Sequence, residues 1–247
     1  MAHAGLYTKN WSKKLSLQRS PLFAKIRHRL YDPLSRIFFL LTIGRLKIKI
    51  QKREYPYFVD WYNYTWTNER TIEISFFSHL LLQFAPQKIL EIGNTLSHYR
   101  KVSHTIIDKY EVADNVENID VLNFKPRGTF DLIFSISTFE HIGWHEKEKR
   151  AEKALESIEH VRTLLSDNGK LVFSFPIGVN PALDRAVSEK KFLHTEIVFL
   201  RRKNRFNMWE VTTYAAVKNS KYNTPYPNAN AICIVTLKKK KVLSPKR

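Results

Sequence analysis

The chain has 247 residues, of which 43% are hydrophobic, and this is enough for one large domain with an extension. Its formal net charge of +18 favours phosphate, anionic lipid or another acidic partner. The single cysteine, Cys233, excludes a disulfide scaffold and a cysteine-based zinc site, and no apolar run reaches the roughly 18–20 residues of a transmembrane helix. The N-terminus also lacks the residue order of a signal peptide, so we expect a cytoplasmic protein.

Residues 1–54 form a basic extension. An apolar block over 36–43 lies within it and is too short to span a bilayer. Two interpretations stay open: the segment lies on an anionic membrane surface, peripheral to the membrane, or it is a solvated arm whose apolar block packs on the main domain. Only Asp32 and Glu54 balance its bases, which are Lys9, Lys13, Lys14, Arg19, Lys25, Arg27, Arg29, Arg36, Arg45, Lys47, Lys49, Lys52 and Arg53.

The main domain is predicted over 55–241 and a basic tail over 242–247. It opens with dense aromatic residues over 55–68, which either line a ligand site or pack the extension on the core. Thr67 is expected to cap a helix over 68–84, because apolar residues there recur at helical spacing.

Strands and helices then alternate along the chain. This order predicts a mostly parallel, doubly wound α/β sheet with helices on both faces. A turn is expected at 167–169. The predicted strands are 89–92, 105–108, 116–120, 130–136, 170–175, 196–200 and 231–237, and the predicted helices are 146–165 and 181–191.

Acidic residues stand at the ends of the first three strands of this sheet. Glu91 lies in the first strand, which stops at Gly93, and the polar residues after it suggest a tight turn into a helix. Asp108 ends the second strand, where a carboxylate accepts hydrogen bonds from both hydroxyls of a ribose. Asp120 follows the third strand and could accept a hydrogen bond from the exocyclic amine of adenine.

At this point the chain resembles a class I S-adenosylmethionine-dependent methyltransferase over about residues 68–237. The resemblance implies seven strands with the last one antiparallel. The matching segments, in order, are LEIG at 90–93, ID at 107–108, FDLI at 130–133, FEHI at 139–142 and LL…NGKL over 164–171.

This resemblance also implies a cofactor site for S-adenosylmethionine. The methionine end would be held by Glu91 and Gly93. Asp108 would hold the ribose, and Asp120 with Val121 would hold the adenine; Asn94, and Ser135 near the end of the fourth strand, are counted with them as cofactor-binding residues. The family usually has glycines two and four positions after the first, where this chain has Thr95 and Ser97. Either Asn94 takes the left-handed conformation and the larger residues are tolerated, or cofactor binding is weaker.

The loop after the fourth strand is expected to face the transferred methyl group. His141 is the candidate general base for a substrate hydroxyl, with Glu140 orienting it or lining the cofactor site. In the alternative interpretation Thr138 and Glu140 cap a helix and His141 packs beneath it. Related enzymes that bind a metal there have another carboxylate before the Glu-His pair, and because this chain has Ser137 we expect no metal.

The sequence therefore predicts a methyltransferase that acts on an oxygen of a small-molecule or sugar-containing acceptor, such as a glycan precursor. One alternative is a nucleic-acid-binding methyltransferase that uses the net charge of +18 on phosphates. Another is a binding protein of the same fold without catalysis, as Thr95 and Ser97 would allow.

Overall fold

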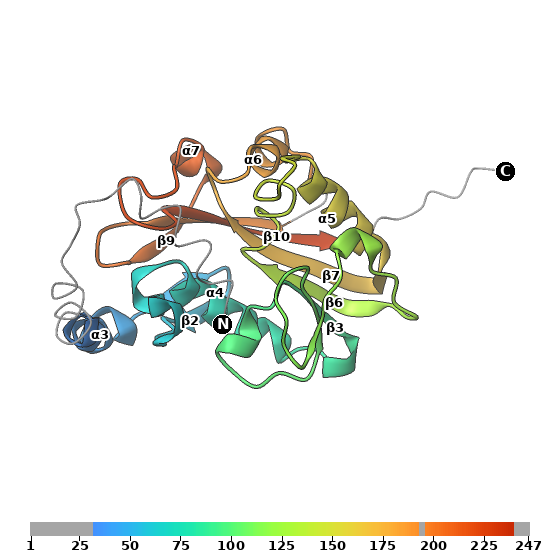
Figure 1. The fold of residues 1–247 in the computed structure, drawn as a ribbon. Coiled ribbons are helices and arrows are strands. Elements are labelled where there is room, and N and C mark those ends of the chain that lie inside the picture. The colour runs from blue at the N-terminus through green and yellow to red at the C-terminus, as the bar shows by residue number, and fades with distance from the viewer. Residues whose placement is uncertain (1–31, 193–195, 240–247) are drawn as a thin grey trace.

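The computed structural model describes residues 32–192 and 196–239, and its centre is an eight-stranded sheet (Figure 1). The predicted tail and all of the basic residues ahead of Asp32 lie outside these ranges. From one edge to the other the strands are β5 (Val116–Glu117), β4 (Thr105–Ile107), β3 (Ile89–Ile92), β6 (Phe130–Ile136), β7 (Leu165–Pro176), β10 (Ala231–Lys238), β8 (Glu196–Arg202) and β9 (Trp209–Thr212).

The five strands from β5 to β7 are parallel, and their order is that of a doubly wound sheet. The last strand, β10, runs antiparallel between β7 and β8. These findings confirm the predicted mostly parallel fold with an antiparallel last strand. The sheet has eight strands instead of the expected seven because the chain turns after β8 and adds β9 as an antiparallel edge strand.

Strand β7 is longer than predicted and includes the expected turn at 167–169. The pairing of β6 with β7 shifts register between Phe130 and Leu132, and this irregularity absorbs the extra residues. A side chain at Gly169 would begin 2.7 Å from the carbonyl oxygen of Phe130, so the glycine permits this close approach.

Helices cover both faces of the sheet, as predicted, but all three predicted helices are shorter than expected. Helix α5 (Lys153–Thr163) begins seven residues after the predicted start at residue 146, and α6 (Pro181–Ser188) is followed by the four-residue α7 (Tyr214–Val217). On the other face, α4 (Arg70–Leu81) begins without the Thr67 cap. Asn68 takes that role, because its Oδ1 accepts the Arg70 N–H at 3.0 Å.

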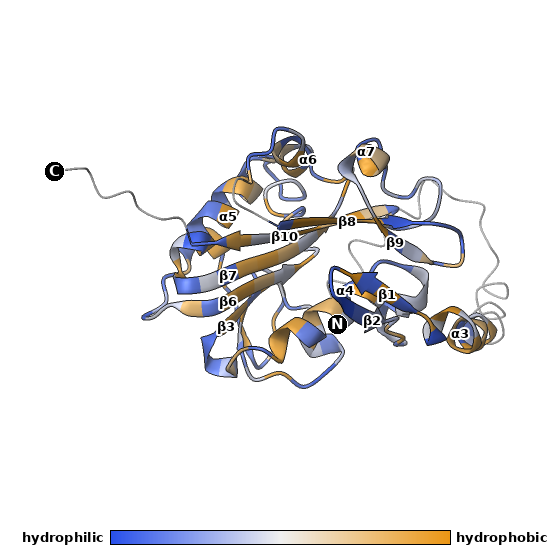
Figure 2. Ribbon diagram, turned by 180° about the vertical axis from the view of Figure 1, so that it is seen from behind, coloured by the Kyte–Doolittle hydropathy of each residue, from blue (hydrophilic) through white to orange (hydrophobic). Residues whose placement is uncertain are grey.

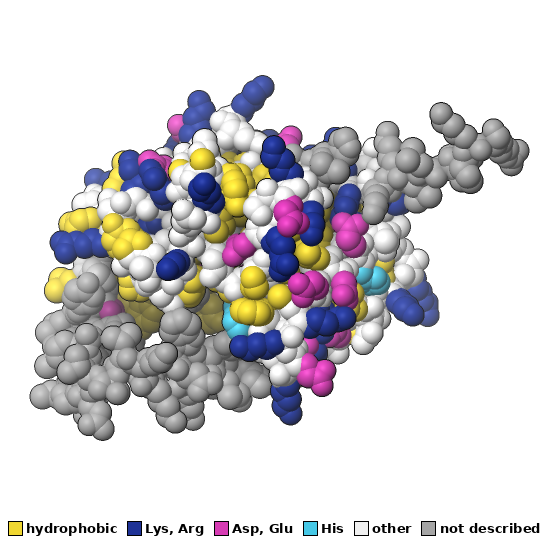
Figure 3. Space-filling view, turned by 90° about the horizontal axis from the view of Figure 1, so that it is seen from above, with side chains coloured by type: hydrophobic (Ala, Val, Ile, Leu, Met, Phe, Trp, Pro, Cys, Tyr) yellow, Lys and Arg dark blue, Asp and Glu magenta, His cyan; other side chains and the backbone are white. Residues whose placement is uncertain are grey.

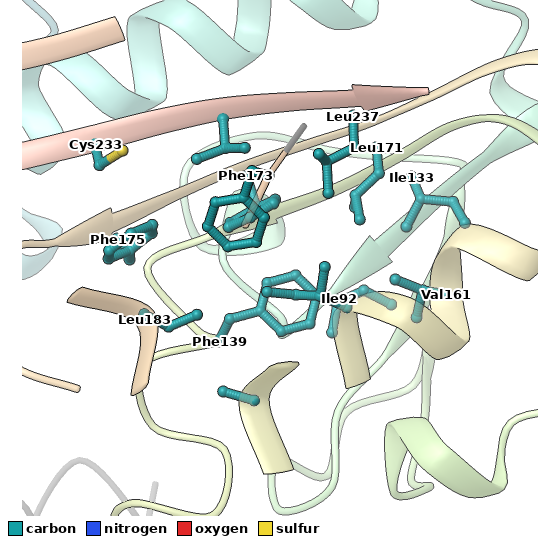
Figure 4. Packing of buried hydrophobic residues seen from close by; sticks show 14 of the residues in the cluster. Ile92, Ile133, Phe139, Val161, Leu171, Phe173, Phe175, Leu183, Cys233 and Leu237 are labelled. Carbon is teal, nitrogen blue, oxygen red and sulfur yellow. The ribbon is translucent and has the colours of Figure 1, made fainter. Parts of the chain in front are cut away.

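Two hydrophobic cores lie on opposite faces of the sheet because side chains alternate along each strand. In β10, Cys233 and Val235 face the first core, which α5 and α6 cover (Figure 4), whereas Ile232 and Ile234 face the second core beneath α4.

The described part of the N-terminal extension belongs to the second core. It consists of α3 (Asp32–Leu41), a short 3₁₀ turn (Ile43–Arg45) and a hairpin of β1 (Lys47–Ile50) with β2 (Arg53–Pro56). The buried side chains among these residues include Phe39, Ile43, Ile48 and Ile50. Figure 2 shows this unit beside α4, away from β3 and β6. Residues 32–54 are therefore packed on the main domain, and none of the described helices is long and apolar enough to cross a membrane.

Candidate functional site

The candidate site is built around Gly93, where β3 ends. Gly93 has a φ of +85°, and its N–H donates to the carbonyl of Ile107 at 2.8 Å. A Cβ at this position would lie 2.3 Å from Oγ1 of Thr138, in the loop after β6. Glycine is therefore required for both the backbone conformation and the contact.

The turn after Gly93 differs from its predicted form. Asn94 does not take the left-handed conformation, because Gly93 itself has the positive φ. The expected helix is also missing: the chain makes only a 3₁₀ turn over Leu96–His98 before β4. Thr95 has a φ of −104°, which any residue can adopt, so the turn needs no glycine there.

Glu91 holds this turn from within. Its side chain is fully buried, and Oε1 accepts the N–H groups of Thr95 at 2.9 Å and Leu96 at 2.8 Å. Oε2 lies 2.7 Å from Nε2 of His104. The structure therefore gives the carboxylate a role in fixing the loop, and its expected contact with a methionine end stays a prediction.

Asp108 lies directly after β4 and faces the same turn. Its Oδ2 accepts the N–H of Asn94 at 3.2 Å, and its Oδ1 accepts the N–H groups of Tyr110 and Glu111 at 2.8 Å each. A carboxylate can accept about four hydrogen bonds, so about one position remains.

Glu111 is a second acid at this place, and the sequence reasoning missed it. Its Oε1 accepts from Nδ2 of Asn94 at 2.8 Å and lies 2.9 Å from Nε2 of His98. Asn94 also accepts a hydrogen bond from the Ser97 hydroxyl. The sequence signal that could have identified Glu111 is its position, three residues after Asp108, which already places an acid at the end of that strand.

Asp120 lies in a cluster of charges. Its Oδ2 is 2.8 Å from Nζ of Lys153 and 3.0 Å from Nζ of Lys109, and both lysines also pair with Glu146. Desolvation would raise the pKa of Asp120, but the lysines and the Leu122 N–H outweigh it and lower the pKa to about 2. Most of the carboxylate's acceptor capacity is therefore used within the protein.

The other two predicted cofactor residues are buried. Val121 packs in the first core. Ser135 is fully buried in β6, and its hydroxyl donates to the carbonyl of Ile92 at 3.0 Å. This bond ties β6 to β3 within the sheet, and the expected cofactor contact of Ser135 stays a prediction.

The carbonyl of Ile136 joins three segments at the end of β6. It accepts hydrogen bonds from Nη1 of Arg70 at 3.1 Å, from Oγ1 of Thr138 at 3.2 Å and from Oγ1 of Thr95 at 3.4 Å. The first turn of α4, the loop after β6 and the turn after β3 therefore meet at one point.

A buried cluster of three glutamates surrounds Arg70, and the sequence reasoning missed this cluster. Glu69, Glu73 and Glu140 are all buried. Arg70 pairs with Glu73 at 2.9 Å, and Glu73 also accepts the Ser137 hydroxyl at 2.6 Å. No sequence signal indicated the cluster, because charges at the start of a helix usually face solvent.

Glu140 has an oxygen without a partner. Within the described residues its Oε2 accepts no hydrogen bond, although the side chain is only 1% exposed. Burial, and then the charges of Glu73 and Glu69, raise the pKa of Glu140 well above its usual value. The carboxyl is therefore held in its neutral form over a wider pH range than an exposed glutamate.

His141 lies beside Glu140 at the surface, with 44% of its side chain exposed. Its Nε2 is 3.7 Å from Oε1 of Glu140, and its Nδ1 is 2.6 Å from Nδ1 of His145. Desolvation, followed by His145 and Arg70, lowers the pKa of His141. The imidazole is therefore neutral at physiological pH. No helix begins at Thr138 or Glu140, so the alternative in which they cap a helix over His141 is wrong.

The aromatic segment at 55–68 divides into two groups. Tyr55, Tyr57 and Trp66 are buried in the second core. Tyr62 is half-exposed and stacks on His98, with ring centroids 4.5 Å apart, so it covers the turn after Gly93. Among the residues that the structure describes, no group of three or more histidines, cysteines or acids could hold a metal ion.

No family model matches the sequence, and no curated protein matches it. Solved structures are similar at low identity. The N-methyltransferase NodS from Bradyrhizobium japonicum WM9, in complex with S-adenosyl-L-homocysteine, is 14% identical over 70% of this chain and 88% of its own, with a TM-score of 0.44. An rRNA methylase from Streptococcus thermophilus is 13% identical over 68% and 97%, with a TM-score of 0.40.

The sugar N-methyltransferase KedS8 from Streptoalloteichus sp ATCC 53650 is 12% identical over 63% of this chain and 81% of its own, with a TM-score of 0.33. Likeness at this level carries no argument about the cofactor or acceptor of this chain. The fold assignment rests on the strand order and directions described above.

Proposed function

We propose that the protein is an S-adenosylmethionine-dependent methyltransferase that methylates an oxygen of a small-molecule or sugar-containing acceptor. The contact between Gly93 and Thr138 carries this proposal. The chain leaves β3 toward β4 on one side and returns to β6 on the other, so this contact lies where the strand order reverses. Doubly wound sheets bind their ligands at this place, outside the carboxyl ends of the strands.

The acids and the cation around the turn suit the polar groups of the cofactor. Asp108 and Glu111 together retain enough acceptor positions for two ribose hydroxyls, since Glu111 uses only Oε1 among the described residues. Arg70 offers a guanidinium to the methionine carboxylate, because it shares the Ile136 carbonyl with Thr95. The backbone of Gly93 and Asn94 faces the methionine end.

The bound cofactor supplies a methyl group on a positively charged sulfur, so the protein mainly has to align the acceptor with it. His141 accepts the proton of the acceptor hydroxyl, because its lowered pKa keeps the ring neutral. The neutral Glu140 carboxyl beside it positions His141 through Oε1, or the acceptor through its unpartnered Oε2.

The test is methyl transfer from S-adenosylmethionine labelled with ¹³C in the methyl group to a panel of sugars and small hydroxyl compounds. Carbon chemical shifts distinguish methyl groups on oxygen from those on nitrogen. We expect a labelled O-methyl product that is lost in His141→Gln. Transfer to nitrogen alone, with His141→Gln fully active, would contradict the assigned chemistry.

A second candidate is a protein of the same fold that has lost catalysis, and Asp120 favours it. Two lysines already occupy the carboxylate that would receive the adenine amine. The two candidates differ in thermal unfolding with S-adenosylhomocysteine. A ligand that binds the native state raises the melting temperature, whereas a lost cofactor site leaves it unchanged.

A further inference from the structure

The solvent face of α3 is apolar, which reverses the usual pattern of a surface helix. Phe39 anchors the helix and is 3% exposed. At 100° per residue, the opposite face contains five large apolar side chains, and each is at least about one-third exposed: Leu34 (63%), Ile37 (49%), Phe38 (50%), Leu40 (36%) and Leu41 (57%).

A second segment extends this apolar face. Phe206, in the turn between β8 and β9, is 43% exposed and contacts Phe38 with ring centroids 5.7 Å apart. The guanidinium of Arg205 lies 4.9 Å from the centre of the Phe206 ring. We call Phe206 and the five α3 residues the α3 patch. Because both segments are packed on the sheet domain, the α3 patch is a fixed part of the surface.

Positive charges flank α3 in the sequence. Arg45 ends the 3₁₀ turn after α3, and Lys47 and Lys49 project from the outer face of β1, where Ile48 and Ile50 point into the core. Arg36, within α3, lies over the ring of Trp61 at 5.1 Å. Residues 1–31, which lead into α3, contain seven lysines and arginines and no acid.

We propose that the α3 patch docks the protein on an anionic lipid surface, with α3 parallel to the membrane plane. Apolar side chains beside lysines and arginines are the composition of a helix that lies at the lipid headgroups, and ten residues are too few to cross a bilayer. Lipid is favoured over nucleic acid because phosphates alone would leave the five apolar side chains of α3 in water. On the face that Figure 3 shows, lysines and arginines are interspersed with acids.

This inference rests on the α3 patch alone and is independent of methyl transfer. The test is cosedimentation of the full chain with phosphatidylcholine vesicles, with and without phosphatidylserine. We expect binding only to vesicles with phosphatidylserine and at least tenfold weaker binding for Leu34→Glu with Leu41→Glu. The matched control is Leu82→Glu with Val112→Glu, because these exposed residues lie outside the α3 patch and should leave binding unchanged.

A second pair of variants tests the charges. Arg45→Glu with Lys49→Glu should weaken binding by at least roughly fivefold for each basic residue removed. The matched control, Lys218→Glu with Lys221→Glu, changes the net charge by the same amount on exposed residues outside the α3 patch. It should weaken binding to the vesicles less. Equal losses in the two pairs, or equal binding to neutral vesicles, would overturn the proposal. So would a dimer in solution that Leu34→Glu with Leu41→Glu converts to a monomer, because the occupant would then be a second copy.

Discussion

Replacing Gly93 with alanine tests the geometry of the candidate site most sharply. The left-handed backbone costs a residue with a Cβ about 1–2 kcal/mol. The new Cβ would also lie 2.3 Å from Oγ1, 2.7 Å from Cγ2 and 2.9 Å from Cβ of Thr138, and overpacking of this kind costs about 1–3 kcal/mol. The sum is about 2–5 kcal/mol. For a chain of this size the melting temperature should fall by roughly 4–20 °C.

Gly128→Ala is the matched control, because a Cβ there meets nothing within 4 Å. Thermal unfolding of both variants should show the loss only at Gly93. Adding Thr138→Ala to Gly93→Ala removes the two shortest contacts and should restore part of the stability, leaving the backbone cost. If Gly93→Ala and Gly128→Ala have the same melting temperature, the close approach of the loops after β3 and β6 is wrong.

Three further changes test the charged groups of the site. The lowered pKa of Asp120 corresponds to about 2 kcal/mol of stability, which is present above pH ~3.8 and is lost as the pH falls toward 2. In denaturant unfolding, the free energy of unfolding of the wild type should therefore exceed that of Asp120→Asn by this amount near neutral pH, and the two values should converge in acid. Glu140 has a raised pKa, so its contribution to the free energy of unfolding is lost as the pH rises above ~4.5. Glu140→Gln should therefore become more stable relative to the wild type as the pH rises. Parallel profiles of stability against pH for the two proteins would contradict the buried neutral carboxyl. His141→Gln should bind S-adenosylhomocysteine normally and lose roughly a hundredfold or more in turnover, whereas normal turnover with a lower melting temperature would make His141 structural.

The strands of the sheet were predictable because each is a short apolar run that ends at a polar or glycine residue. Ile89–Ile92 and Phe130–Ile136 match their predicted limits, and both Glu91 in β3 and Asp108 after β4 contact the turn that follows Gly93. The edge strand β9 was missed because only Trp209 among its four residues is buried and the strand pairs with β8 through a local hairpin.

The start of α5 could not be read from periodicity. The apolar spacing begins at Ala151, but Glu146 is drawn away from the helix by Lys109 and Lys153. Gly143, with a φ of +71°, accepts the N–H of Arg150 at 2.7 Å and closes a loop instead. Contacts between distant residues decide this boundary, and no local pattern contains them.

The buried cluster around Arg70 was hidden for the same reason. In the sequence, Glu69 and Glu73 look like solvent-facing charges in the first turn of a helix. They are buried because that turn packs against the loop after β6, where Ser137 donates to Glu73. Likewise, no local pattern showed that the Glu91 oxygens bind the turn after Gly93 and His104, whereas its expected contact with the methionine end stays a prediction.

Calorimetric titration of the full chain with S-adenosylhomocysteine tests whether the turn at Gly93 binds S-adenosylmethionine. We expect saturable binding of one molecule per chain, strongly weakened in Gly93→Ala and unchanged in Gly128→Ala. No heat of binding up to millimolar ligand, from protein that unfolds cooperatively, would contradict the claim.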